Sequence, residues 1–397
     1  RGLGDVYKRQ LPLSMGVDVV EVNEPLETGL ELLAETGWPR PQVDETAAGH
    51  LIPAASDSAY RAINRLLADD VGVRRLAKDS GIGNRGDIYL STANVNVSKL
   101  EEIANELHVP VAPVEKEPGV EMLQVEGARV GLFKPWVASM DEGWTRFVLE
   151  QYEFPLTTIS NEKIRSGDFA NEVDVLVFPA VSPAIIAKGE PAKGSRYRRR
   201  WAPMPPKYSG GIDTFPETDD TAKKKSDEVK RIMGGERLKN WVEAGGTGVA
   251  LDSSSQYFID LFELPVSDVL AKVDRDDFNC PGSTLRVEMN MDSPLTFGMR
   301  AEEAIYFADS PTFQTRVPDP RFDRTVVARY PRDDKDILLS GYLEGGQLLE
   351  KRAAVVEIEV GQGRVILIGF RPQHRAQPVR TFKLLFNTLY TLEAPTG

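Results

Sequence analysis

The chain has 397 residues, of which 41% are hydrophobic, so it is long enough to bury the cores of about two to three globular domains. Its formal net charge of −12 argues against a general nucleic-acid binder or a protein of anionic membrane surfaces, because the field of the whole molecule would repel both. Cys280 is the single cysteine, which excludes an internal disulfide and a multi-cysteine zinc or iron–sulfur site. No stretch approaches the roughly 20 apolar residues that a membrane-spanning helix needs.

The first part of the chain shows little sign of regular structure. The phrase "DVYKRQ" resembles the translation of a sequencing-adapter end, so residues 1–10 are expected to be artefactual or disordered. Residues 11–56 contain scattered proline and glycine and show no firm hydrophobic period. They are predicted to be the irregular tail of a truncated upstream domain.

Residues 57–128 have the pattern of a small α/β unit. Apolar residues recur at helical spacing in "DSAYRAINRLLADD", and the composition of "VGVRRLA" and "GDIYLST" is typical of strands. The phrase "VSKLEEIANELHVPVAPV" predicts a helix followed by a strand. These elements together predict a small α/β linker domain.

From residue 129 onwards, short apolar strands alternate with amphipathic helices. Strands are predicted in "RVGLF", "PLTTIS", "DVLVFPA" and "TGVALDS", and helices in "DEGWTRFVLEQY", "SDEVKRIMGGERLKNWVEAGG" and "SSQYFIDLFEL". This alternation predicts an α/β fold with a doubly wound, mostly parallel sheet covered on both faces. Residues 188–228 are predicted to form a loop excursion that leaves the carboxyl edge of the sheet.

After Leu264 the pattern changes toward β structure. The phrases "STLRVEMN", "AIYFADS", "TVVARYP" and "AAVVEIEVGQGRVILIGFRP" alternate or run apolar, and "GQG" is typical of a hairpin turn. A last helix is predicted over "RTFKLLFNTLYTLE". The C-terminal part is therefore expected to add β-rich elements to the α/β fold.

Several long phrases resemble one known family: "RVGLFKPWVASMDEGWTRFVLEQYEFP", "DVLVFP", "WVEAGGTGVALDSSS", "FNCPGSTLRV" and "GRVILIGFRPQHRAQPVRTFKLLFNTL". They are similar to the C-terminal region of large bacterial zinc carboxypeptidases of the carboxypeptidase A-like class. The resemblance covers residues 129–392. It implies that residues 129–397 form a class I glutamine amidotransferase-like, flavodoxin-like domain, which in that family follows the metallopeptidase domain.

The resemblance also implies which site this fragment lacks. The family binds zinc through a His-x-x-Glu pair and a later histidine, whereas His50, His108 and His374 are not followed by a glutamate at the third position. No metal site and no cofactor are therefore expected here, and zinc is expected only in a missing upstream peptidase domain. The implied partners are that domain and a peptide or carbohydrate ligand, and the implied parent protein is secreted or periplasmic.

The turn after the strand "TGVAL" is where an amidotransferase-like nucleophile would lie. A Gly-x-Cys-x-Gly pattern is needed there, and the chain has "ALDSSSQYF" instead. Ser253 or Ser254 could attack a substrate if a base polarised it, although a serine before a helix is more often an N-cap. A catalytically silent, accessory domain is therefore expected, and an active amidase or hydrolase using Ser253 or Ser254 is the alternative.

Further candidates lie on the loops and helix starts that a parallel sheet gathers at its carboxyl edge. Glu142 could serve as a base or bind a ligand, although Asp141 and Glu142 also suit the first turn of a helix, where the dipole favours acids. Trp136 could line a pocket or anchor the packing of a helix.

The loop "GFRPQHRAQ" supplies the last candidates, Arg371 as a ligand-binding residue and His374 as a ligand-binding residue or base. The neighbouring cations Arg371 and Arg375 are expected to lower the pKa of His374, whether it is a base or part of a surface loop. The surface loop is the preferred interpretation. Cys280 lies in a predicted turn and is expected to be a small buried residue.

Overall fold

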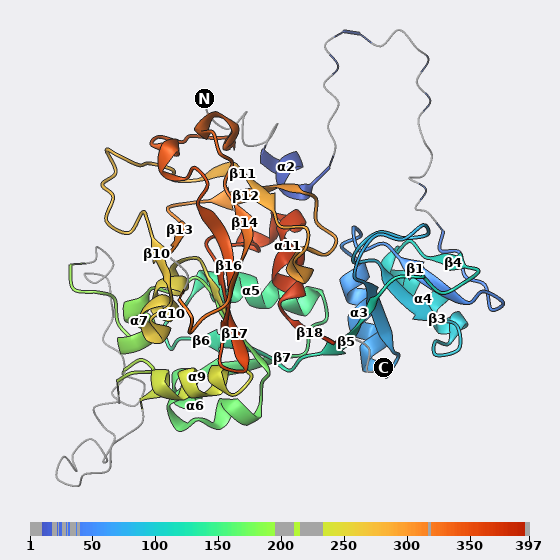
Figure 1. Cartoon of the computed structure of the whole chain (residues 1–397), viewed down its shortest axis with the longest axis horizontal. Helices are drawn as coiled ribbons and strands as arrows, with labels where there is room; N and C mark the ends of the chain where they lie inside the picture. The colour runs from blue at the N-terminus through green and yellow to red at the C-terminus, as the bar shows by residue number, and fades with distance from the viewer. Residues whose placement is uncertain are drawn as a thin grey trace.

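The protein is described here from a computed structural model, which covers residues 10–17, 40–194, 210–214, 233–316 and 319–393 and single positions between 22 and 37. Two β-sheets and the helices that cover them make up this part of the chain (Figure 1). The expected disordered segment at 1–10 lies outside it except for Gln10, as does most of the expected excursion over 188–228. Among the described helices, none has the length and apolarity to cross a membrane.

The smaller sheet has six antiparallel strands in the order β18-β5-β2-β3-β1-β4. The helices and strands predicted between residues 57 and 114 are confirmed: α3 (Ala59–Ala68), β2 (Val73–Leu76), β3 (Ile88–Ser91), α4 (Val97–Leu107) and β4 (Ala112–Val114). The prediction of an irregular tail over 11–56 is wrong for its last residues, because Gly49–Ile52 form β1 between β3 and β4. All four residues of β1 are buried, so the strand has no alternating pattern that a sequence would reveal.

The C-terminal end of the described chain lies in this small sheet. The last helix, α11 (Val379–Asn387), ends before Tyr390, and Tyr390–Glu393 form β18. This strand pairs antiparallel with β5 (Met122–Gly127), as Figure 1 shows beside the C-terminus. The predicted helix over "RTFKLLFNTLYTLE" is therefore wrong for its last residues, because the open edge of β5 offers them ladder hydrogen bonds.

The larger sheet has twelve strands, and five neighbouring ones are parallel in the order β7-β6-β8-β9-β17. They are β6 (Val130–Lys134), β7 (Leu156–Ser160), β8 (Val175–Phe178), β9 (Thr247–Leu251) and β17 (Gly363–Ile368). Numbered along the chain, this order is 2-1-3-4-5, one of the two common orders of open doubly wound sheets. Each of these five strands lies within a phrase for which the sequence predicts a strand, so these five predictions are confirmed.

Antiparallel strands extend the same sheet beyond β17. They are β16 (Ala353–Val360), β14 (Arg324–Arg329), β11 (Ser283–Met289) and β12 (Glu302–Phe307). The shorter β10 (Val266–Asp268), β13 (Phe313–Thr315) and β15 (Leu338–Ser340) pair alongside. The predicted hairpin is confirmed, since Val360 lies opposite Gly363 across the turn. The fold is thus mixed α/β, and the parallel arrangement holds for five strands rather than for most of the sheet.

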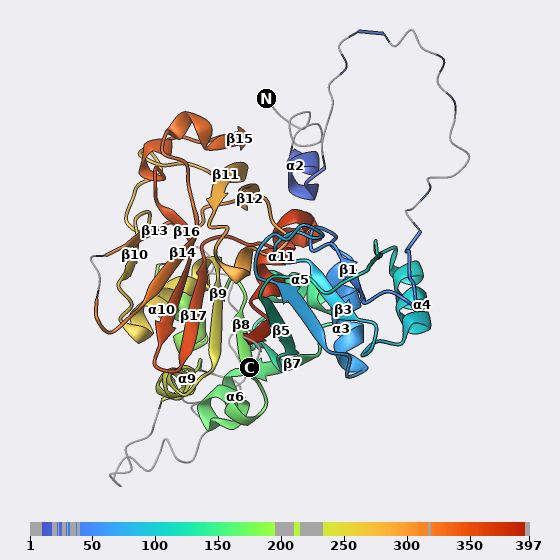
Figure 2. The same cartoon turned by 45° about the vertical axis from the view of Figure 1, so that its right-hand side comes forward.

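Helices cover both faces of the parallel strands. Leu132 of β6 belongs to one core together with Leu149 of α5 (Met140–Gln151) and Leu385 of α11. The next residue, Phe133, belongs to the opposite core, which contains residues of α6 (Asn161–Ser166), α7 (Pro183–Lys188), α9 (Gly234–Glu243) and α10 (Ser255–Phe262). Adjacent residues of a strand point to opposite faces, so this division shows the two layers directly (Figure 2).

The two sheets share one hydrophobic core. Ile63 and Leu66 of α3 belong to the same buried cluster as Leu132 and Leu385 of the larger unit. At this junction the ring of Tyr60 lies 5.3 Å from that of Phe386. Because no solvent layer divides that cluster, we expect the small unit to unfold together with the large sheet rather than as an independent linker.

Candidate functional site

The carboxyl edge of the parallel sheet carries a strained turn at the end of β9. Asp252, the first residue after the strand, has a φ of 52°, in the left-handed region that few non-glycine residues adopt. Aspartate is among the residues that tolerate this conformation best. A short 3₁₀ turn and then α10 follow. Asp252, and neither of the predicted serines, therefore occupies the tip of the strand-to-helix turn.

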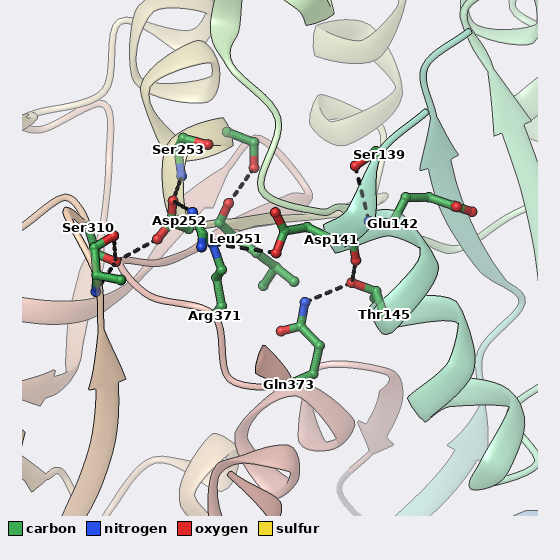
Figure 3. Close-up of polar contacts among 12 residues, drawn as sticks. Ser139, Asp141, Glu142, Thr145, Leu251, Asp252, Ser253, Ser310, Arg371 and Gln373 are labelled. Atoms are coloured by element: carbon green, nitrogen blue, oxygen red, sulfur yellow. Dashed lines mark hydrogen bonds and ion pairs between the residues drawn. The ribbon is translucent and has the colours of Figure 1, made fainter. Parts of the chain in front are cut away.

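Hydrogen bonds hold the Asp252 side chain, which is 2% exposed, in this position (Figure 3). Ser310 Oγ donates to one carboxylate oxygen at 2.6 Å, and the Ser253 backbone N–H donates to the other at 2.7 Å. Burial raises the pKa of Asp252, and the nearby Arg371 guanidinium partly opposes that rise. The side chain thus ties the turn after β9 to the loop that carries Ser310.

Arg371 bridges two carboxylates, one from the first turn of α5 and one from the 3₁₀ turn after β9. Its Nη2 lies 3.4 Å from Asp252 Oδ1, and its Nε lies 3.5 Å from Asp141 Oδ1. Burial raises the pKa of Asp141, Arg371 lowers it, and the Asp252 charge raises it again. The structure therefore brings together two predicted ligand-binding residues, Asp141 and Arg371, with one that the sequence did not single out.

Gln373, two residues after Arg371, completes this arrangement. The Thr145 hydroxyl donates to the backbone carbonyl of Asp141 at 2.7 Å, so its oxygen accepts the hydrogen bond from Gln373 Nε2, also at 2.7 Å. This contact fixes which end of the Gln373 amide faces Thr145. The other end, Oε1, is buried and has no hydrogen-bond partner among the described residues, although the residue is only 1% exposed.

Among the described contacts, neither serine of the predicted pair has a hydroxyl hydrogen bond to a side chain that could act as its base. Ser254 is buried, and its hydroxyl donates to the backbone carbonyls of Leu251 at 2.8 Å and Phe178 at 3.1 Å. Ser254 occupies the N-cap position of α10, as the N-cap interpretation expects, but its side chain accepts no hydrogen bond from a backbone N–H of the helix, so the expected capping contact is absent. Ser253 is half-buried, and its backbone N–H is the group that contacts Asp252.

Glu142 lies apart from this cluster. Its carboxylate accepts hydrogen bonds from Arg146 Nη2 at 2.6 Å and Nε at 2.9 Å, one helical turn further on. Figure 3 shows the side chain directed away from Asp252 and the Ser253 turn. The expected position in the first turn of the helix is confirmed, since Ser139 caps α5 by accepting from the Glu142 backbone N–H.

The two tryptophans of this region lie on its outer side. Trp136 is 49% exposed, in the loop between β6 and α5. Trp144 packs edge-on against Phe147, with 5.9 Å between ring centroids. Trp144 is thus a packing contact of the helix surface, whereas Trp136 presents about half of its side chain to solvent.

His374 is buried, and the preferred interpretation as a surface-loop residue is wrong. Its ring stacks on Tyr306, with centroids 4.1 Å apart and planes inclined by 18°. Burial, and then the charges of Arg371 and Arg375, lower the pKa of His374 to about 4. The expected influence of the two arginines is therefore present, but burial is the larger cause. The imidazole is neutral at pH 7.

A first prediction concerns this histidine. In the unfolded chain it takes up a proton near pH 6.5, whereas in the folded protein it does so only near pH 4, so folding is progressively disfavoured as the pH falls between these values. The full difference is on the order of 3 kcal/mol. We expect His374→Gln to lose less stability than the wild type between pH 7 and pH 4 in urea unfolding. Parallel pH profiles of the two proteins would contradict this.

Cys280 is fully buried, as expected, and burial raises the pKa of its thiol to about 11. The thiolate, the reactive form, is therefore scarce at neutral pH. No group of three or more His, Cys, Asp or Glu side chains suited to a metal ion occurs within the described ranges.

Comparison with known proteins gives similarities of structure only. No family model matches the chain, and no curated protein matches it. A cytoplasmic protein from Salmonella typhimurium is 15% identical, with a TM-score of 0.38, over 66% of this chain and 97% of its own. A ThuA-like protein from Bacteroides uniformis is 11% identical, with a TM-score of 0.36, over 65% and 88%. A β-galactosidase from Bacillus circulans is 12% identical, with a TM-score of 0.34, over 66% and 31%.

Proposed function

We propose that this chain is a non-catalytic, ligand-binding accessory region of a zinc carboxypeptidase-like protein, with a class I glutamine amidotransferase-like domain. The resemblance of its long phrases over 129–392 supports the family. The parallel order 2-1-3-4-5 and the strained turn after β9 support the domain type. Peptidase chemistry would then belong to a domain upstream of this sequence.

The observation that carries the non-catalytic part is the residue at the tip of the turn. Acyl transfer from an amide needs an accessible, activated nucleophile beside oxyanion donors. Asp252 is buried there, and both of its carboxylate oxygens accept hydrogen bonds. Ser254 donates its hydroxyl hydrogen to backbone carbonyls, which leaves no base to activate it. The arrangement favours a site that holds loops together and binds a ligand at their rim.

A panel of amide and ester substrates tests this proposal. We expect background turnover from the wild type and the same from Ser253→Ala, Ser254→Ala and Glu142→Ala. Loss of a triad nucleophile removes on the order of a millionfold in rate, so an active serine would give a clear signal. Turnover abolished by one of these changes, with the circular dichroism spectrum intact, would favour the hydrolase alternative.

The carboxypeptidase part has its own test. The genomic reading frame upstream of this sequence is expected to encode a His-x-x-Glu pair and a later histidine. An upstream frame that encodes a different kind of domain would contradict the assignment to this family without affecting the account of the site.

A further inference from the structure

A pocket lies at the amino edge of the parallel sheet, opposite the edge that carries Asp252. Arg129, Asp174 and Gly246, the residues just before β6, β8 and β9, line it from the side of the sheet. Its other walls come from residues that follow α6 and from α9, two helices that lie side by side (Figure 1). The pocket volume of about 580 Å³ is within the range of roughly 300–1,000 Å³ that is usual for small-molecule sites.

Arg237 of α9 brings an unpaired positive charge to this pocket. Its guanidinium forms no hydrogen bond and no ion pair with any residue that the structure describes. The side chain is half-buried, and of its three nitrogens only Nε is buried. Glycine at position 167 leaves room for the group, because a Cβ there would stand 3.0 Å from Arg237 Nη1. Nη1 and Nη2 are therefore open to solvent and free to donate hydrogen bonds to a ligand.

The other two charged residues of the lining neutralise each other. Arg129 donates to both oxygens of the Asp174 carboxylate, from Nη2 at 2.6 Å and from Nε at 3.0 Å. These contacts lower the pKa of Asp174, so the aspartate is ionised at neutral pH. The C-terminal end of α9 adds only a partial negative charge, roughly half an elementary charge. The free charge of Arg237 therefore makes the pocket favour an anion over a cation.

Two aromatic rings form an apolar wall of the pocket. The centroids of Phe169 and Trp241 lie 5.5 Å apart, with their planes inclined by 64°. The indole lies against Gly246, where a Cβ would come within 2.4 Å of Trp241 Cε2. The indole N–H makes no hydrogen bond within the described part of the chain, and its nitrogen is not fully buried. The wall thus combines apolar surface with one further donor.

We propose that this pocket binds a carboxylate carried on a small aromatic or aliphatic body. The carboxylate accepts hydrogen bonds from Nη1 and Nη2 of Arg237, and the apolar body covers the rings of Phe169 and Trp241. An ammonium group on the ligand finds no free carboxylate, because Arg129 holds Asp174. A simple acid is therefore preferred to a zwitterion. This inference does not rest on the proposed function, which places its ligand at the carboxyl edge.

Titration of the full chain with phenylacetate tests the pocket. The neutral, zwitterionic and cationic comparison ligands are 2-phenylethanol, L-phenylalanine and benzylamine. The readouts are calorimetry and the NMR signal of the Trp241 indole N–H, which its loss in Trp241→Phe assigns. We expect phenylacetate to shift this signal and to bind about tenfold or more tightly than each comparison ligand. Its affinity should fall as the salt concentration rises. Absence of phenylacetate binding, or equal affinity for any comparison ligand, would overturn the proposal.

One variant and a matched control locate the binding. Arg237→Gln removes the free charge and is expected to weaken the affinity for phenylacetate about tenfold or more. Lys239→Gln removes a positive charge two residues further along α9, on a side chain outside the pocket lining, and should bind as the wild type does. Equal weakening in both variants would show a general effect of net charge and would overturn the site.

Arg237→Lys gives a second test if Arg237→Gln folds poorly by circular dichroism. It keeps the charge but loses the planar donor fork, so its affinity should lie between those of the wild type and a chain without the charge. Wild-type affinity in Arg237→Lys would contradict the forked contact. None of the ligands contains an amide or ester bond, so the result is independent of the substrate panel described above. Turnover in that panel would change the proposed function and leave this pocket as it stands.

Discussion

Asp252→Ala is expected to destabilise the protein by about 2–4 kcal/mol, because buried partners lose their hydrogen bonds. Ser310 Oγ would lose its acceptor, the Ser253 N–H would lose its own, and Arg371 would keep one carboxylate neighbour in place of two. Alanine also tolerates the φ of 52° at this position less well than aspartate does. The free energy of unfolding in urea measures the effect.

The neighbouring Ser253→Ala is the control for this prediction. Ser253 is half-buried in the same turn, and only its backbone N–H contacts Asp252, so the change should cost less than about 0.5 kcal/mol. Asp252→Asn should be intermediate, because asparagine accepts the left-handed conformation and retains one acceptor oxygen. If Asp252→Ala proved as stable as Ser253→Ala, the side chain would have no part in holding the loops.

The same residue gives a pH dependence whose sign follows from its burial. The pKa of Asp252 is higher in the folded protein than its ordinary value of 3.8 in the unfolded chain. Its contribution to stability is therefore fully present below pH 3.8 and is lost as the pH rises through the folded value. The stability advantage of the wild type over Asp252→Asn should accordingly shrink as the pH rises through that range.

The sequence predicted the parallel strands because each is a short, mostly apolar or β-branched run in a region where such runs alternate with amphipathic helices. The strands β6, β7, β8 and β9 and the helices α5 and α10 lie where these patterns indicated. Their periodicity depends on burial against local neighbours, which a sequence records directly. Strands whose pairing is distant were harder to predict, since β1 and β18 are short and take their place from the edges of β3, β4 and β5.

The site was predicted only in part, for a related reason. The segment after β6 carries Asp141, and the segment after β17 carries Arg371 and His374. Segments that follow parallel strands gather at one edge of the sheet, so these residues are expected to lie there. Asp252 follows the strand "TGVAL" directly, so its place at the strand end is a signal in the sequence. The prediction nevertheless selected Ser253 and Ser254, because serine is a common nucleophile and aspartate is a rarer one at such a turn. Ser310 has no such signal, because it reaches Asp252 from an antiparallel part of the sheet, 58 residues further along the chain. The Gln373 contact with Thr145 likewise depends on packing that no local pattern records.

The junction of the two sheets gives the largest stability effect that we expect. Arg75 of β2 is fully buried, its Nε donates to the Gly86 carbonyl at 2.9 Å, and its Nη1 donates to Asn387 Oδ1 at 2.8 Å. The guanidinium also lies 4.7 Å from the centre of the Phe297 ring. Asn387 belongs to α11 of the large unit, so this single side chain connects both sheets.

Arg75→Ala is expected to cost about 3–5 kcal/mol, because it opens a cavity and leaves two buried acceptors with fewer donors. The adjacent Arg74→Ala is the matched control: Arg74 is 31% exposed and pairs with the exposed Glu117, so its loss should cost less than about 1 kcal/mol. Because the two sheets share one core, both should lose amide-exchange protection in a single transition, followed at β3 for the small sheet and at β9 for the large one. Separate transitions, with Arg75→Ala lowering only that of the small sheet, would show that the small unit is an independent domain after all.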